Sequence, residues 1–186
     1  MTEAEILDGC RRGDRQARHE LYVQTSARVY RLLLRMTREP ETALDLAQAT
    51  YLKVFTRISQ FDGRAAVATW IHRIAVTEAL QYLRKQGRDA GMPGTATEAV
   101  DSVSDNQATD VRMDIEDALA LLEPLDRTIL LLRYDVGHDY RAIAETLDCA
   151  EGTVASRLNR ARERLRFVLK NSYFPEEDAP SKHQIL

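Results

Sequence analysis

The chain has 186 residues, of which 44% are hydrophobic and 30% charged, and its formal net charge is −3. This length fits one medium domain or two small ones, and 8 Gly and 5 Pro are too few for an all-β fold with many turns. The N-terminus lacks a signal-peptide core, and no apolar run approaches the roughly 20 residues of a membrane span. We therefore expect a cytoplasmic protein without membrane insertion.

Side chains that usually carry catalysis or bind metals are scattered. Cys10 and Cys149 lie far apart in the sequence, as do the four histidines, which are better explained as surface or structural residues than as ligands: His19, His72, His138 and His183. There is no H-E-x-x-H motif, no Gly-rich phosphate loop and no recognisable Ser or Cys nucleophile. We predict that the protein is not an enzyme, with no catalytic residues, metal or cofactor.

Capping residues and apolar periodicity predict two helices at the start of the chain. Thr2 and Glu5 form a capping box for a short helix that ends at Gly13. Asp14 can cap a second helix that reaches about Thr37. Its apolar face consists of Leu21, Val29, Leu32, Leu33 and Met36.

Two further helices complete the first part of the chain. Pro40 suits the first turn of a helix that continues to about Ile58. Residues 61–63 form a turn, and a fourth helix spans about Ala66 to Lys85. The third helix is expected to pack through Leu44, Ala47, Leu52, Val54 and Phe55. The fourth is expected to pack through Val67, Ile71, Ile74, Ala75, Ala79 and Tyr82.

Periodicity disappears between Gly87 and Arg112, where Gly, Thr, Ser, Asp and Ala dominate. From Asp89 to Asp110 there are five acidic and no basic residues, so this stretch carries a charge of −5. A flexible coil of this length spans about 30 Å on average, and about 90 Å when stretched. The sequence therefore predicts a flexible acidic linker.

Helices resume at Met113 and include Leu125–Val136, Tyr140–Leu147 capped by Asp139, and Glu151 to about Asn171. A turn at Asp148 requires a left-handed backbone, and the polar tail after Pro175 is expected to be disordered. We predict an all-α fold with two small domains. Their boundaries are 1–86 for the first domain, 87–112 for the linker, 113–174 for the second domain and 175–186 for the tail.

The segment Tyr140–Arg162 has a short helix, a tight turn and a longer helix, the pattern of a helix-turn-helix. One stripe of the longer helix is apolar and faces the core: Val154, Leu158, Ala161, Leu165 and Val168. On the opposite side, Ser156, Asn159 and Arg160 carry groups that suit base edges in the major groove. Groups that suit phosphates flank them: Thr153 at the helix start, and Arg157, Arg162, Arg164 and Arg166.

The charge of this last helix supports a role in binding DNA. Residues 151–170 contain six basic and two acidic residues, a charge of +4. The alternative is an arginine-rich helix that is merely solvated. The short helix and turn before it favour the DNA-binding interpretation.

The fourth helix carries a second stripe with an aromatic side chain, hydrogen-bonding groups and cations. This stripe consists of Trp70, Arg73, Thr77, Gln81 and Arg84. Such a stripe can follow a phosphate backbone and hold an unstacked base. The alternative is that Trp70 is a core residue and the arginines are solvated.

These segments resemble the extracytoplasmic-function (ECF) sigma factors of the sigma-70 superfamily. GTVASRLNRARERLR (152–166), preceded by YRAIAETLD (140–148), is similar to their region 4.2. LDLAQATYLKVF (44–55) resembles their regions 2.1–2.2, and FDGRAAVATWIHRIAVTEALQYLRK (61–85) resembles regions 2.3–2.4. The likeness covers about 150 residues with both blocks in order.

The resemblance implies a subunit that directs RNA polymerase to specific promoters and initiates transcription. Asp45, Gln48 and Lys53 would dock on the β′ clamp helices of core polymerase, and the β flap would be a second contact. The stripe with Trp70, Arg73, Thr77, Gln81 and Arg84 would bind the −10 element as a single strand. The last helix would read the −35 element through Thr153, Ser156, Arg157, Asn159, Arg160, Arg162 and Arg164.

The resemblance also implies promoter DNA and an anti-sigma factor as partners of two mobile domains. The chain departs from the family pattern at Ala49, Thr77, Gln81 and Asp148, where an acidic residue, Asn, Asp and Gly are usual. Two other functions stay open. One is a helix-turn-helix DNA-binding regulator that does not associate with core polymerase, and the other is an adaptor that does not initiate transcription.

Overall fold

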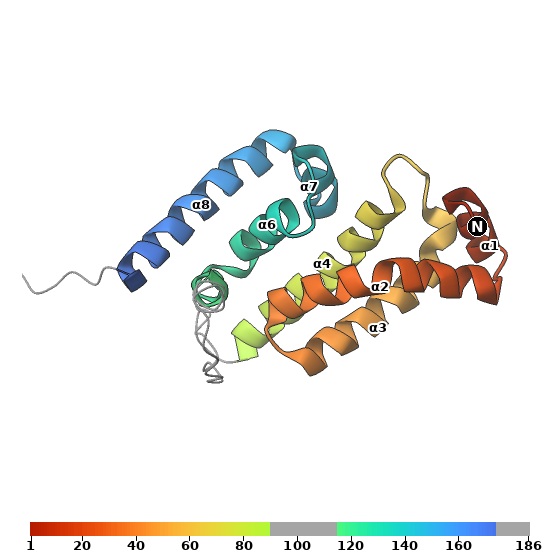
Figure 1. Cartoon of the computed structure of the whole chain (residues 1–186), viewed down its shortest axis with the longest axis horizontal. Helices are drawn as coiled ribbons and strands as arrows, with labels where there is room; N and C mark the ends of the chain where they lie inside the picture. The colour runs from red at the N-terminus through yellow and green to blue at the C-terminus, as the bar shows by residue number, and fades with distance from the viewer. Residues whose placement is uncertain (90–114, 174–186) are drawn as a thin grey trace, which may run out of the picture.

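The computed structural model describes residues 1–89 and 115–173, and every regular element in these ranges is a helix. The helices form an N-terminal unit (residues 1–89) and a C-terminal unit (residues 115–173), which lie side by side (Figure 1). The predicted all-α, two-domain fold is therefore confirmed. Residues 90–114 and 174–186, which include most of the predicted linker and tail, lie outside the described residues.

The N-terminal unit contains four α-helices and a short 3-10 helix. Their bounds are α1 Glu3–Arg11, α2 Arg15–Thr37, α3 Pro40–Arg57, the 3-10 helix Ile58–Gln60 and α4 Val67–Asp89. The predicted caps are present. The Thr2 side chain accepts from the backbone N–H of Glu5, whose carboxylate accepts from Thr2 N at 2.7 Å. The Asp14 carboxylate accepts from the N–H groups of Gln16 and Ala17, so it satisfies two donors that the first turn of α2 leaves free.

The C-terminal unit begins with a short helix over residues 115–120. It continues with α6 Pro124–Tyr134, α7 Tyr140–Leu147 and α8 Glu151–Tyr173. Asp139 caps α7 by accepting from Ala142 N at 2.7 Å. Asp148 ends α7 in a left-handed conformation with φ 53°, as the sequence predicted. The helix-turn-helix is therefore present with the predicted bounds of α7.

Some expectations about these helices were wrong. The fourth helix extends to Asp89, beyond the predicted end at Lys85. On α3, Leu44 and Leu52 are not core residues, since they are 51% and 70% exposed. The buried face of this helix is rotated away from Leu44 and Leu52, toward the side on which α2 and α4 pack. The buried residues of α3 are Ala43, Thr50, Tyr51 and Val54.

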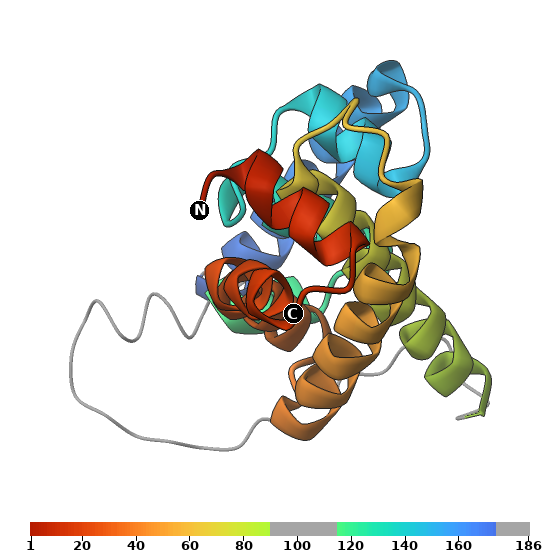
Figure 2. The same ribbon diagram turned by 90° about the vertical axis from the view of Figure 1, so that its right-hand side faces the viewer.

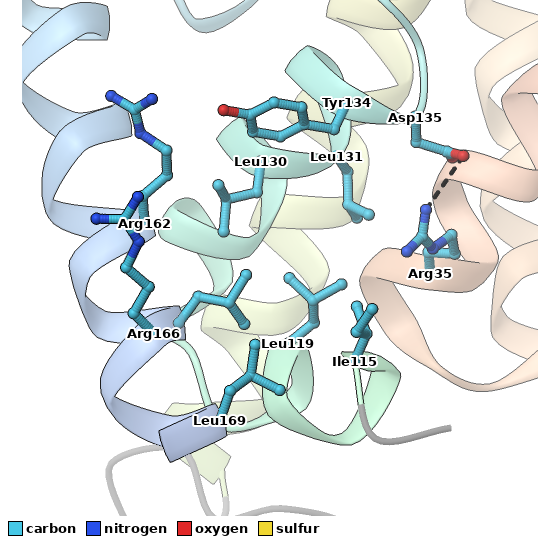
Figure 3. Close-up of a pocket in the computed structure, with 11 residues that line it drawn as sticks. Arg35, Ile115, Leu119, Leu130, Leu131, Tyr134, Asp135, Arg162, Arg166 and Leu169 are labelled. Atoms are coloured by element: carbon cyan, nitrogen blue, oxygen red, sulfur yellow. Dashed lines mark ion pairs between the residues drawn. The ribbon is translucent and has the colours of Figure 1, made fainter. Parts of the chain in front are cut away.

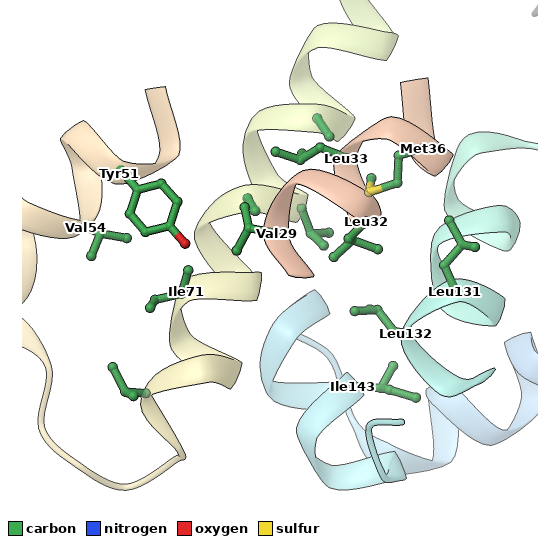
Figure 4. Close-up of a cluster of buried hydrophobic side chains, with 14 of the residues drawn as sticks. Val29, Leu32, Leu33, Met36, Tyr51, Val54, Ile71, Leu131, Leu132 and Ile143 are labelled. Atoms are coloured by element: carbon green, nitrogen blue, oxygen red, sulfur yellow. The ribbon is translucent and has the colours of Figure 1, made fainter. Parts of the chain in front are cut away.

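The two units share one continuous hydrophobic core. Helix α7 packs against α4, and α6 packs against α2. Leu32 and Met36 of α2 point toward Leu131 and Leu132 of α6, with Ile143 of α7 beside them (Figure 4). The docking is also visible after a quarter turn (Figure 2). The apolar periodicity of the sequence did not predict it, because the side chains involved belong to helices far apart in the chain.

Ion pairs reinforce this docking at the C-terminal end of α2. Arg35 contacts Glu116 at 2.7 Å and Asp135 at 3.1 Å. One turn later, Arg38 contacts Asp117 at 2.8 Å. Cations near the C-terminus of α2 also interact favourably with its helix dipole. The two units are thus joined by charge as well as by apolar packing.

Arg127 of α6 forms hydrogen bonds to backbone carbonyls of both units. Its guanidinium donates to Met36 O at 3.0 Å, and to Ala120 O and Leu122 O at 3.1 and 3.3 Å. Burial lowers the pKa of this guanidinium, and the nearby charge of Arg38 lowers it further. One buried cation therefore satisfies carbonyls at the ends of two helices, which a helix cannot satisfy by itself.

Candidate nucleic-acid and protein interfaces

Helix α8 is the longest helix described in the C-terminal unit. Its inner stripe is anchored in the core, with Val154, Leu158 and Ala161 buried. Because a helix turns 100° per residue, this anchoring directs Ser156, Asn159 and Arg160 to solvent, and all three are exposed. The residues predicted to read base edges therefore lie together on one open face of a helix-turn-helix.

The flanking cations of α8 are not equally available. Arg164 donates to the carboxylate of Asp126, which is buried on α6. Arg162 donates to the side-chain oxygen of Asn159. Within the described residues, neither Arg157 nor Arg160 forms an ion pair, and Arg160 is the more exposed of the two, so it is open to a ligand.

The stripe on α4 lies on the N-terminal unit. Trp70 is half-buried, and its ring centroid lies 5.4 Å from that of Phe61. The other four residues of this stripe are exposed: Arg73, Thr77, Gln81 and Arg84. Arg73 also reaches across the interface between the units to Asp148, at 3.3 Å. In the docked form this stripe therefore begins beside the turn of the helix-turn-helix.

Helix α3 offers a different kind of surface. Asp45 and Gln48 are exposed, whereas Lys53 pairs with Glu78 of α4 at 2.5 Å. Leu44 and Leu52, which were predicted to be core, lie one turn on either side of Gln48 and form an open apolar stripe with it. Exposed leucines at this spacing are a feature of protein-binding helices.

A cavity of about 450 Å³ lies where α8 faces the start of the C-terminal unit and α2 (Figure 3). Leu119, Leu130 and Leu169 line it, Arg162 and Arg166 stand along α8, and the Arg35–Asp135 ion pair closes the opposite side. The walls are apolar and the α8 side is basic. This combination suits an apolar side chain from an acidic protein segment.

Two histidines that the sequence does not link meet at the interface between the units. His72 Nδ1 of α4 lies 3.1 Å from His138 Nε2, in the turn before α7. Burial and the neighbouring His138 lower the pKa of His72 to about 4, and burial also lowers the pKa of His138. No local sequence pattern links the two positions, because they lie 66 residues apart in the chain.

The described residues contain neither a candidate membrane span nor a candidate metal site. None of their helices is long and apolar enough to span a bilayer. Nor do three or more His, Cys, Asp or Glu side chains gather in these ranges as a metal site would require.

Comparisons with known proteins match both units in chain order. The family model of sigma-70 region 2 matches residues 21–89, and the model of sigma-70 region 4 matches residues 112–165. The ECF RNA polymerase sigma-E factor of Haemophilus influenzae is 32% identical over 88% of this chain and 93% of that protein. The RNA polymerase sigma-H factor of Pseudomonas aeruginosa is 29% identical over 90% and 94%, respectively.

A solved structure has a similar arrangement of helices. It is the co-crystal structure of the sigma factor RpoE with the anti-sigma factor NepR from Bartonella quintana, which has a TM-score of 0.68 and 25% identity. The match covers 82% of this chain and 96% of that one. A DNA-binding regulator without a polymerase-binding region would not match region 2. The chain belongs to the sigma-70 family and is an RNA polymerase sigma factor of the ECF type.

Proposed function

We propose that the exposed face of α8 reads the −35 promoter element as duplex DNA. The observation that carries this proposal is the open cluster of Ser156, Asn159 and Arg160 on a helix-turn-helix. Amide and guanidinium groups can form bidentate hydrogen bonds to adenine and guanine. Thr153 and Arg157 at the start of α8 would bind phosphates. Arg164 would also bind a phosphate once its ion pair with Asp126 is broken.

Arg160→Ala tests this role. Loss of one bidentate contact weakens binding to the correct base by about 1–3 kcal/mol, so we expect roughly 5- to 150-fold weaker transcription from a cognate −35 element. The control is Arg15→Ala, which removes one exposed cation from the N-terminal unit. Both variants would be assayed with core polymerase in vitro. Equal activity of the two variants would contradict the proposed role of α8.

The exposed stripe of α4 is the proposed site for the unwound −10 strand. Arg73 and Arg84 would contact phosphates, and Thr77 and Gln81 would form hydrogen bonds to an unstacked base. Trp70 is half-buried against Phe61, so it would anchor the end of the stripe to the core. Thr77 and Gln81 replace residues usual in the family, so the preferred −10 bases are expected to differ from those of its relatives.

The proposed polymerase-binding surface is the stripe Leu44, Gln48 and Leu52 with Asp45 beside it. Leu52 is 70% exposed, so Leu52→Lys should leave the fold intact while removing an apolar contact with the β′ clamp helices. We expect at least tenfold weaker binding to core polymerase, measured with a fluorescently labelled chain. Ser59→Lys, which adds the same charge at an exposed site, is the control. Unchanged affinity of the Leu52 variant would exclude this surface.

Binding both promoter elements requires the two units to separate. The elements lie nearly two turns of DNA apart, on the order of 60 Å, whereas α4 and α7 are in contact here. We propose boundaries of 1–86 and 113–174 for the two domains, and because α4 continues to Asp89, the part of 87–112 that follows this residue would be the linker that allows separation. The protein would act in the cytoplasm without enzymatic activity or a cofactor.

The Bartonella structure contains an anti-sigma factor, and we propose a partner of that kind for this chain. The apolar cavity beside Arg162 and Arg166 is a candidate binding site for it. Transcription with core polymerase on a promoter that no other sigma factor serves tests the function as a whole. Promoter-specific transcripts support it. DNA binding without transcripts would indicate an ordinary regulator, and polymerase binding without transcripts an adaptor.

A further inference from the structure

The contact between His72 and His138 is the only one between two ionisable rings in the described part of the interface. His72 is 4% exposed, and docking of the C-terminal unit contributes to covering it. The ring centroids are 5.0 Å apart, and the two facing nitrogens are 3.1 Å apart. At that distance one nitrogen must donate and the other must accept, which two neutral imidazoles can do.

The charged groups around the two rings give little support to an added proton. Arg28 of α2 is the cation whose field reaches His72. Arg133 of α6 donates to the carbonyl oxygen of His138 at 3.0 Å. Asp139 is the carboxylate that favours a charged His138, but it already caps α7. At the same interface, the opposite charges of Arg73 and Asp148 are paired with each other.

We propose that the His72–His138 contact is a pH-responsive latch: the docked form is favoured while both rings are neutral, and the cost of placing a proton at this buried contact shifts molecules toward the separated form. A proton added in the docked form places a charge at a site shielded from water and close to Arg28. Separation exposes both rings to water, where an imidazolium is well solvated. Protons therefore favour the separated form.

The size of the effect follows from proton linkage. His72 has a pKa of about 4 when docked, and in the separated form we expect the ordinary value of about 6.5. Docking is then strongest at neutral and higher pH, and it weakens as pH falls from about 6.5 toward 4. Between pH 7.5 and 5.5 the ratio of separated to docked molecules should rise about tenfold from His72 alone. His138 shifts the ratio in the same direction.

The latch concerns the conformation of the chain and holds whether or not the proposed promoter contacts are correct. Where those contacts are correct, it implies that mild acidification increases the fraction of molecules able to span two promoter elements. The two claims can be tested separately, because the separation of the units can be measured without DNA or polymerase.

Single-molecule energy transfer on the full chain tests the latch. Dyes attached through non-canonical residues at the exposed positions Gln60 and Glu163 report separated and docked molecules directly. We expect the ratio to rise about tenfold from pH 7.5 to 5.5 in the wild type. The rise should stay below twofold in the double variant His72→Gln/His138→Gln, whose amides do not titrate. The variant His19→Gln removes an exposed histidine and should behave like the wild type.

A second measurement keeps the test decisive if the double variant folds poorly. Titration of the imidazole signals of the wild-type chain by NMR should show His72 with a pKa well below the ordinary value of about 6.5. A ratio that does not change with pH, or an equal pH response in the double variant, would overturn the latch. So would titration of His72 near pH 6.5, or the absence of docked molecules at pH 7.5.

Discussion

Leu132→Ala provides a direct test of whether the two units share one core. Leu132 is fully buried on α6 and lies between Leu32 of α2 and Ile143 of α7 (Figure 4). Truncating a buried leucine to alanine costs about 2–5 kcal/mol, because apolar burial is lost and a cavity remains. With a loss of about 3 kcal/mol and a slope near 2 kcal/mol per M, the midpoint of urea unfolding should fall by about 1.5 M.

Two probes can follow the units separately. The chain contains a single tryptophan, Trp70, so its fluorescence reports on the N-terminal unit. Circular dichroism at 222 nm reports on the helices of both units. If the core is continuous, the substitution on α6 should shift both transitions together. Leu121→Ala makes the same chemical change at a site that is 62% exposed, and we expect it to shift neither by more than about 0.5 kcal/mol.

A shift of only one of the two signals would show that the units do not share one core. Should the Trp70 transition keep its midpoint while the dichroism signal alone moves, the units would unfold independently. The packing between α2 and α6 would then contribute little to stability.

Two further predictions concern local features. Asp14→Ala should lower the free energy of unfolding by about 1 kcal/mol, because two N–H groups of α2 lose their acceptor. Asp14→Asn keeps an acceptor oxygen and should retain most of that stability. Thermal unfolding measures both variants, and equal losses would contradict the role of Asp14 as a cap. Burial raises the pKa of the Cys10 thiol, whereas Cys149 is half-exposed. A disulfide reagent should therefore modify Cys149 quickly and Cys10 only as the chain unfolds. Cys149→Ser should abolish the fast phase, and a fast phase that survives would refute the assignment.

Much of the local structure could be predicted from the sequence. The starts of α1, α2 and α7 follow from Thr2, Asp14 and Asp139, because a capping side chain acts on N–H groups within three residues of itself. The exposed face of α8 followed from the same local rule, since its buried stripe fixes which side meets solvent. The helix-turn-helix with its DNA-reading candidates was therefore determined by sequence alone.

Periodicity failed where a helix has neighbours on more than one side. Leu44 and Leu52 of α3 looked like core residues, yet the side that α2 and α4 cover is the one with Ala43 and Tyr51. A hydrophobic residue on a helix indicates only that burial would be favourable. Which face is covered depends on where the other helices lie, and the leucines that stay exposed are the ones we assign to polymerase binding.

The docking of the two units was decided by tertiary structure alone. It brings His72 against His138, a pair separated by 66 positions in the chain. Packing of α8 on α6 within the C-terminal unit likewise brings Arg164 against Asp126, 38 positions apart. Each of these residues looks unremarkable beside its sequence neighbours, and its burial or charge pairing comes from a partner that no local pattern specifies. Local interactions set the helices and their caps, whereas contacts between distant surfaces set the latch and the availability of each cation.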